Sequence, residues 1–103
     1  MPLYHIVLFR LKPTVTVETL EEFKSSARAM VSKVPGLIKL EINRPLPDTA
    51  YRSQGFNMGL VAILEKAEDL PGYTTHPAHS RVHELRESVA DGESLAYDLE
   101  FPA

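Results

Sequence analysis

Histidine and tyrosine side chains gather in one short segment of this chain. The segment His76-Pro77-Ala78-His79 has Tyr73 three residues upstream, and His5 lies in the first apolar run. A histidine titrates near neutral pH, and a phenol held nearby can donate a hydrogen bond to a developing oxyanion. These residue types are therefore suited to acid–base chemistry on a small molecule.

The position of Pro77 determines whether these rings can meet. Tyr73 and His79 are six residues apart, which on one continuous helix places them on different sides. Because Pro77 biases His76 away from helical dihedrals and starts a new helix, a bend there is predicted to aim both rings into one cleft. His5 reaches the same cleft if its strand face meets the bend. The alternative is that the His-Pro pair only starts a helix and Tyr73 only packs against the sheet.

Other titratable residues have simpler interpretations. His79 and His83 lie four residues apart and form half of a possible metal site. A solvated helix flank that continues to Arg86 is favoured, because the sequence lacks the glutamate of the metalloprotease pattern between them. We expect neither a metal nor a cofactor. Asp98, on the last predicted strand, either orients a histidine or is solvated at a sheet edge.

Composition restricts the classes of protein to which the chain can belong. Its 103 residues predict one domain, 1–103, that needs no disulfide or metal to fold. It has no cysteine, which excludes thiol nucleophiles. The net charge of -3, with basic residues scattered from Arg10 to Arg86, argues against nucleic acid. No apolar run reaches membrane-spanning length and the first residues resemble a strand more than a signal, so a soluble cytoplasmic protein is expected.

Hydrophobic periodicity predicts strands at four places. Residues 3–11 and 56–64 are apolar on both faces, as in central strands covered on both sides. Residues 37–43 and 95–101 alternate between apolar and polar, which is typical of edge strands. A polar, proline-rich connection at 44–55 joins the second and third strands. In the second strand the residues expected on one buried face are Ile38, Leu40 and Ile42.

Two amphipathic helices are predicted between these strands. Thr16 can cap the first, whose apolar residues recur at three- and four-residue steps until Pro35-Gly36 ends it. The second begins at Pro77 and ends at Asp91-Gly92. Leu70-Pro71-Gly72 is expected to interrupt a helix immediately before Tyr73 and so to affect the direction of that side chain.

The resulting order, strand-helix-strand-strand-helix-strand, is that of the ferredoxin-like α+β fold (βαββαβ). It predicts a four-stranded antiparallel sheet with the first and third strands central. Right-handed crossovers place both helices on one face of the sheet. The other face is left uncovered although the central strands are apolar on both faces. We therefore expect a homodimer in which a second copy covers that face, giving a dimeric α/β barrel.

Five segments together resemble the stress-responsive A/B barrel domain (Dabb) family of the dimeric α/β barrel superfamily. The resemblance covers nearly the whole chain and implies homodimers whose sheets close a barrel. The segments that carry it are His5-Ile6-Val7-Leu8-Phe9-Arg10-Leu11-Lys12, Val34-Pro35-Gly36, Gly59-Leu60-Val61-Ala62, Tyr73-Thr74-Thr75-His76-Pro77-Ala78-His79 and Tyr97-Asp98-Leu99-Glu100-Phe101.

The resemblance also implies an activity. The best understood member of the family, olivetolic acid cyclase, is a cofactor-free plant polyketide cyclase that closes a poly-β-keto thioester by intramolecular aldol condensation. The match implies that Tyr73 and His79 are catalytic, with His79 taking a proton from carbon and Tyr73 orienting it or stabilising the enolate oxygen. It places His5, His76 and Asp98 around the substrate pocket.

An apolar pocket is expected to hold the tail of such a substrate. Two functions remain open: a cofactor-free cyclase or lyase that binds a small apolar carbonyl compound, and a non-catalytic stress-responsive homodimer in which the His-Pro-Ala-His motif is structural. A cofactor-free monooxygenase of the wider barrel group is a more distant third. The residues expected to wall the pocket are Val7, Phe9, Phe23, Ala27, Leu60 and Ala62.

Overall fold

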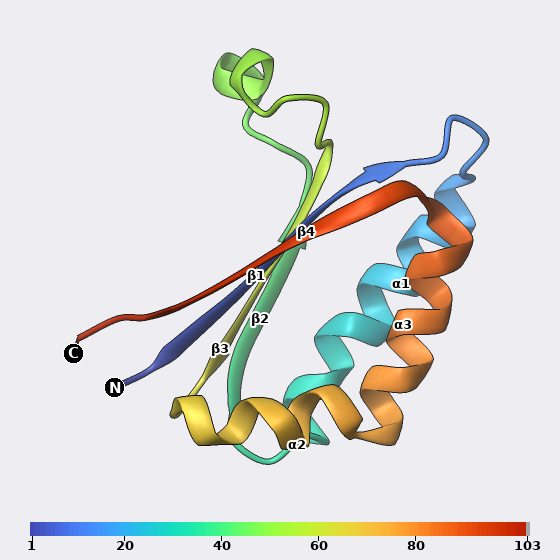
Figure 1. Cartoon of the computed structure of the whole chain (residues 1–103). Helices are drawn as coiled ribbons and strands as arrows, with labels where there is room; N and C mark the ends of the chain where they lie inside the picture. The colour runs from blue at the N-terminus through green and yellow to red at the C-terminus, as the bar shows by residue number, and fades with distance from the viewer. Residues whose placement is uncertain (103) are drawn as a thin grey trace.

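A single antiparallel sheet forms one layer of the molecule, and helices form the other (Figure 1). A computed structural model describes residues 1–102. The strand order is β2-β3-β1-β4, so the first and third strands are central, as predicted. The strands are β1 (Leu3–Leu11), β2 (Leu37–Asn43), β3 (Met58–Leu64) and β4 (Ala90–Glu100).

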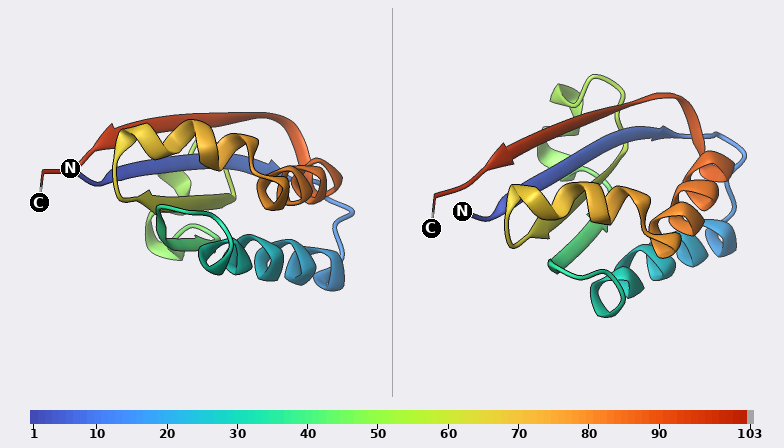
Figure 2. Two further views of the ribbon diagram at one scale, coloured as in Figure 1. Left: turned by 90° about the horizontal axis from the view of Figure 1, so that it is seen from below. Right: turned by 60° about the horizontal axis from the view of Figure 1, so that its bottom comes forward.

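The helices lie on one face of this sheet, which confirms the predicted ferredoxin-like fold. Figure 2 shows α1 and α3 beside each other against the sheet, with α2 leading into α3. The α-helices are α1 (Val17–Ala29), α2 (Leu70–Thr75) and α3 (Pro77–Val89). Short 3-10 turns add η1 (Met30–Ser32), η2 (Pro47–Arg52) and η3 (Ala67–Asp69).

The core lies between the sheet and the helices. Alternate residues of β1, from Leu3 to Leu11, are buried on the helix side, because successive side chains of a strand point to opposite faces. The rings of Phe9 and Phe23 meet edge to face with centroids 5.7 Å apart. Burial of each such side chain contributes about 1.5–3 kcal/mol to folding.

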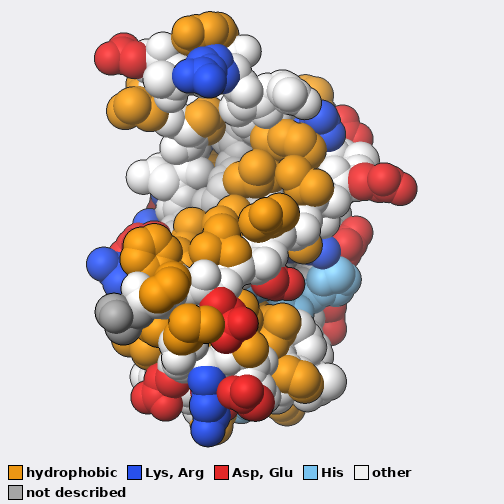
Figure 3. Space-filling model, turned by 60° about the vertical axis from the view of Figure 1, so that its left-hand side comes forward, with side chains coloured by type: hydrophobic (Ala, Val, Ile, Leu, Met, Phe, Trp, Pro, Cys, Tyr) orange, Lys and Arg blue, Asp and Glu red, His pale blue; other side chains and the backbone are white. Residues whose placement is uncertain are grey.

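The opposite face of the sheet is left open by this chain. Figure 3 shows hydrophobic side chains gathered over it. Those of the central strands are partly exposed, and on β4 Tyr97 is 62% exposed. We call this surface the open sheet face. Its apolar residues are Tyr4, Ile6, Leu8, Val61, Ile63, Leu95, Tyr97 and Leu99.

One strand departs from its predicted alternation. The pairing of β2 with β3 shifts register between Leu37 and Lys39. This irregularity turns Leu37 and Leu40 toward the core and leaves Ile38 52% exposed. The prediction that Ile38 shares the buried face of Leu40 and Ile42 is therefore wrong.

The boundary between α3 and β4 also differs from the prediction. The helix ends at Val89 and β4 begins at Ala90, well before residue 95. Asp91 and Gly92 therefore belong to the strand and do not end the helix. The pairing with β1 shifts register here, and Gly92 adopts a φ of +75°, which glycine tolerates best.

Local signals at the helix ends give mixed results. Thr16 caps α1 as predicted, its hydroxyl oxygen accepting a 3.1 Å hydrogen bond from the Thr19 amide. The expected interruption at Leu70-Pro71-Gly72 is wrong, because Pro71 occupies the first turn of α2, where its missing N–H costs nothing. The third strand begins at Met58, and the connection before it contains η2.

Candidate active site

A sharp bend separates α2 from α3. His76 has φ -67° and ψ 141°, an extended conformation that the following Pro77 favours. The amide of Ala78 donates a 3.0 Å hydrogen bond to Nδ1 of His76, which caps the new helix. The chain direction therefore changes between Tyr73 and His79.

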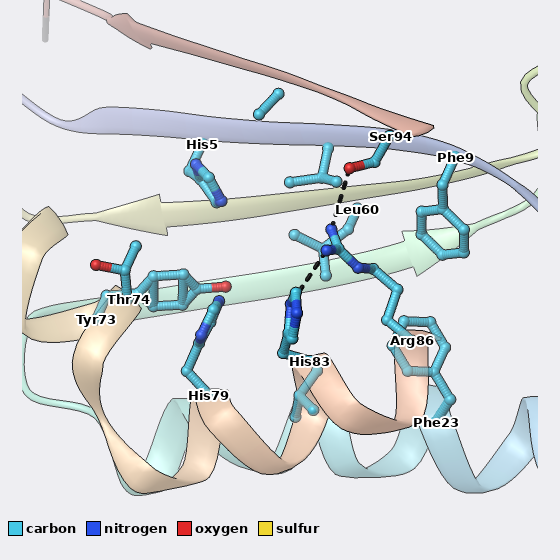
Figure 4. Close-up of a pocket in the computed structure, with 13 residues that line it drawn as sticks. His5, Phe9, Phe23, Leu60, Tyr73, Thr74, His79, His83, Arg86 and Ser94 are labelled. Carbon is cyan, nitrogen blue, oxygen red and sulfur yellow. Dashed lines mark hydrogen bonds between the residues drawn. The ribbon is translucent and has the colours of Figure 1, made fainter. Parts of the chain in front are cut away.

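The bend brings the rings of Tyr73 and His79 together. Their centroids are 4.8 Å apart and their planes are inclined by 64°. On its other side, Tyr73 meets the ring of His5 from β1 at 5.5 Å and 68°. The ring of Tyr73 thus contacts two histidine rings from different elements, and Figure 4 shows the three rings at one end of a cavity.

This cavity has a volume of about 280 Å³ and lies between the sheet and the helices, with lining residues from α1, α2 and α3. Its size is near the lower end of known ligand pockets, of about 300–1,000 Å³. Ala27 and Ala62 were expected in its wall but lie in the core without lining it. The lining residues are His5, Val7, Phe9, Phe23, Leu60, Tyr73, Thr74, His79, Val82, His83, Arg86, Ser94 and Ala96.

Two predicted site residues, His76 and Asp98, do not line the cavity. His76 instead caps α3 with its own ring. Asp98 lies opposite His5 in the β1–β4 register, and its carboxylate accepts a hydrogen bond from Nδ1 of His5. Because Asp98 occupies that nitrogen, Nε2 is the His5 ring atom left for other partners.

Arg86 is a cavity residue that the sequence analysis did not identify. Its guanidinium donates to Nδ1 of His83 at 3.1 Å and to the Ser94 hydroxyl at 3.4 Å (Figure 4). His79, His83 and Arg86 follow the i, i+4, i+7 spacing of one helix face, which is the signal that could have revealed the group. The interpretation of this face as a solvated flank is wrong for Arg86, whose side chain is only 21% exposed.

Burial controls the acid–base character of Tyr73. The side chain is 1% exposed, and burial raises the pKa of its phenol to about 12, opposed by the nearby positive charge of Arg86. The phenol therefore keeps its proton over the physiological range. It can donate a hydrogen bond to an oxyanion in the cavity.

The pKa of His79 is shifted in the direction expected of a general base. Burial lowers its pKa below 6.5, and charge–charge repulsion with His83, His5 and Arg86 lowers it further, against a hydrogen bond to the Thr74 backbone. The imidazole is therefore neutral near pH 7. A neutral imidazole beside a protonated phenol is a base and an acid in contact.

Between residues 1 and 102, no three histidine or carboxylate side chains converge as a metal site would require. No described helix has the length and apolarity needed to span a bilayer.

The fold and the cavity together define a class: a ferredoxin-like α+β protein with a tyrosine and two histidines at the end of an apolar cavity. Residues 3–101 match the model of the Stress responsive A/B Barrel Domain (Dabb). The chain belongs to this family. No curated protein matches its sequence.

Solved structures share this fold over almost the whole chain. A dimeric protein of unknown function from Bacteroides fragilis has a TM-score of 0.78 and 25% identity, over 97% of this chain and 96% of that one. A dimeric ferredoxin-like protein of unknown function from Jannaschia sp. has a TM-score of 0.84 and 20% identity, over 98% and 100%. A hydroxynitrile lyase from Passiflora edulis has a TM-score of 0.83 and 14% identity, over 98% and 97%.

Proposed function

We propose that this protein binds a small, largely apolar carbonyl compound and catalyses a cofactor-free proton transfer on it, leading to an aldol-type cyclisation or a related lyase step. The observation that carries the proposal is the contact of Tyr73 with His79, whose ring centroids are 4.8 Å apart at one end of the cavity. Catalysis of this kind needs a base and an oxyanion donor at the same carbonyl group.

The proposed reaction begins with proton removal. The neutral His79 ring takes a proton from the carbon beside a substrate carbonyl, and the electron pair of that C–H bond moves to form an enolate. The Tyr73 hydroxyl donates a hydrogen bond to the enolate oxygen. The enolate carbon then attacks a second carbonyl of the same molecule, forming the new C–C bond. The resulting alkoxide takes back the proton from His79.

The apolar end of the cavity supports binding of the substrate tail. Phe9 and Phe23 line it together with Val7 and Leu60. Such side chains favour hydrocarbon or aromatic groups over water. Olivetolic acid cyclase of the Dabb family closes a poly-β-keto thioester. We extend that reaction to this chain as a proposal.

A lyase reaction is the second enzymatic candidate. A structural neighbour from Passiflora edulis is a hydroxynitrile lyase. The same base and the same oxyanion donor serve cleavage of a C–C bond when the aldol steps run in reverse. Separate incubations with the open-chain compound and with the cyclised compound would show whether the protein favours cyclisation or cleavage.

One observation favours a non-catalytic role for part of the motif. The ring of His76 is used in capping α3, so this residue acts in folding and not in the cavity. If the whole segment is structural, the protein is a stress-responsive homodimer without enzymatic activity. This alternative predicts that loss of His79 changes stability without any activity to lose.

Turnover of a linear poly-β-keto thioester tests the proposal. His79→Ala and Tyr73→Phe are each expected to lower the rate roughly a hundredfold or more while the thermal midpoint stays nearly unchanged. His76→Asn is the matched control, because asparagine can still cap the helix and the cavity is untouched. Wild-type rates in the His79→Ala variant would contradict the proposal, as would wild-type protein that turns over none of a panel of such thioesters.

The proposal includes a cytoplasmic homodimer that assembles through the open sheet face. An apolar face of this kind is unusual on a monomer. Structural neighbours from Bacteroides fragilis, Thermobifida fusca and Jannaschia are dimeric. Pairing two such faces supports a closed barrel with the helices outside.

A further inference from the structure

The cavity carries a single permanent charge, and that charge is positive. The chain as a whole has a net charge of -3. Yet none of the described residues that line the cavity is an aspartate or a glutamate, and only Arg86 among them is always ionised. A positive group in an otherwise apolar and neutral cavity of an acidic protein favours an anionic ligand.

The surroundings of Arg86 leave this charge incompletely balanced. Its nearest carboxylate is that of Glu87, with Nη2 and Oε1 3.6 Å apart, and the Glu87 side chain is 66% exposed. The other two partners, His83 and Ser94, carry no negative charge. A guanidinium has five N–H donors, so these contacts leave donors for a further partner. A solvated glutamate at 3.6 Å is a weak competitor for it.

The charge of Arg86 also affects the pKa values of the two proposed reacting groups. It lowers the pKa of the Tyr73 phenol and that of His79. His79 and Arg86 are seven residues apart on α3, about 10 Å along the helix axis. The His83 ring lies between them, with its centroid 6.4 Å from that of His79. A ligand whose carbonyl and anionic groups are three or four bonds apart covers a distance of about this size once the hydrogen bond at each end is included.

We propose that the cavity prefers, among such carbonyl compounds, one that also bears a carboxylate, with Arg86 binding the carboxylate and Tyr73 facing the carbonyl. The guanidinium fork matches the two oxygens of a carboxylate. The Ser94 hydroxyl, which accepts from Arg86, has its own O–H free to donate to the same group. This inference rests on the proposed function for the position of the carbonyl, and it names the substrate class.

Calorimetric binding of a matched pair of probes tests this inference without any need for turnover. The probes are β-benzoylpropionate, which has a phenyl ring, a ketone and a carboxylate, and its neutral amide. The wild-type protein is expected to bind the acid at least about tenfold more tightly than the amide, as for other charge-assisted contacts. The preference should vanish in Arg86→Gln and partly persist in Arg86→Lys, which keeps the charge but loses the fork.

Arg81→Gln is the matched control. Arg81 is on the same helix, but its side chain is 59% exposed and pairs with Glu22 and Glu84 outside the cavity. This variant should keep the full preference for the acid. Circular dichroism of each variant verifies folding, and Arg86→Lys keeps the test decisive if Arg86→Gln does not fold.

Three results would overturn the inference: equal affinity of wild-type protein for the acid and the amide, an undiminished preference in Arg86→Gln, or binding of neither probe. Failure of the proposed function has a different signature. Tyr73→Phe and His79→Ala should retain the preference for the acid even though they lose turnover. A wild-type protein that prefers the acid but turns over no substrate therefore contradicts only the catalytic proposal.

Discussion

The ring of Tyr73 packs edge to face against the ring of His79, with centroids 4.8 Å apart. The two residues belong to different helices and meet only because the chain bends at His76 and Pro77. Tyr73 is almost fully buried, so its phenol is held in one orientation. A fixed donor beside a fixed base is the arrangement that proton transfer requires, because the cost of orienting both groups is met during folding.

The pH dependence of turnover should follow His79. Only its neutral form accepts a proton, and its pKa is lowered by burial and by His83, His5 and Arg86. The rate is therefore expected to rise with pH through a midpoint below 6.5 and to remain level through neutrality. The Tyr73 phenol, whose pKa is raised to about 12, adds no alkaline loss near neutral pH.

Steady-state rates across this pH range check the prediction. In His83→Gln, loss of the charge–charge repulsion between His83 and His79 should move the midpoint upward, toward 6.5. A midpoint above 6.5 in the wild type would mean that His79 is not the base.

The hydrogen bond between Asp98 and His5 should contribute measurably to stability. The His5 side chain is 11% exposed, so removing its acceptor leaves a buried N–H without a partner. Asp98→Ala is expected to lower the free energy of unfolding by about 1–2 kcal/mol in urea titrations. Glu100→Ala, an exposed change two residues along the same strand, should stay within about 0.5 kcal/mol of wild type. Equal stabilities of the two variants would mean that the pair is not formed in solution.

Gly36 should resist substitution more strongly than Gly92. Both have positive φ, +83° and +75°, but a Cβ on Gly36 would lie 2.5 Å from Oδ2 of Asp69, whereas one on Gly92 meets nothing within 4 Å. Gly92→Ala should cost about 1–2 kcal/mol from backbone strain alone, and Gly36→Ala clearly more.

A double variant separates the two causes. Asp69→Ala combined with Gly36→Ala removes the obstructing carboxylate but keeps the Cβ of residue 69, 3.0 Å from the new methyl group, so the cost of the alanine at position 36 should fall toward that of Gly92→Ala. Thermal or chemical unfolding measures each step. If Gly36→Ala is equally destabilising in the Asp69→Ala background, the steric clash with Asp69 is not the reason that position 36 requires glycine.

The assembly proposed for the open sheet face makes a prediction of its own. Wild-type protein should sediment at twice the chain mass of 11.5 kDa. Tyr97→Glu is expected to shift it to the monomer, because a carboxylate there would be buried against the partner sheet without a compensating charge. Val17→Glu, at an apolar residue of α1 that is 74% exposed, is the matched control and should remain dimeric. A monomeric wild type at micromolar concentration would rule out the assembly.

Periodicity predicted the element order and the central strands, because the spacing of apolar residues along the chain distinguishes a helix from a strand. The bend at Pro77 was also predictable, since a proline restricts the residue before it. The identity of Tyr73 and His79 as cavity residues followed from that bend. The role of Leu70-Pro71-Gly72 was not predictable, because a proline that interrupts a helix in its interior is also accepted in its first turn.

Only the tertiary structure decided what depends on contacts between distant segments. The bulge that exposes Ile38 arises from pairing between β2 and β3, which local alternation does not encode. Arg86 lines the cavity because β4 and its Ser94 lie beside α3, so a helix position that resembles a solvated flank becomes half-buried. The chain's own sequence thus determined which elements form and where they bend, whereas the packing of those elements decided which side chains line one cavity.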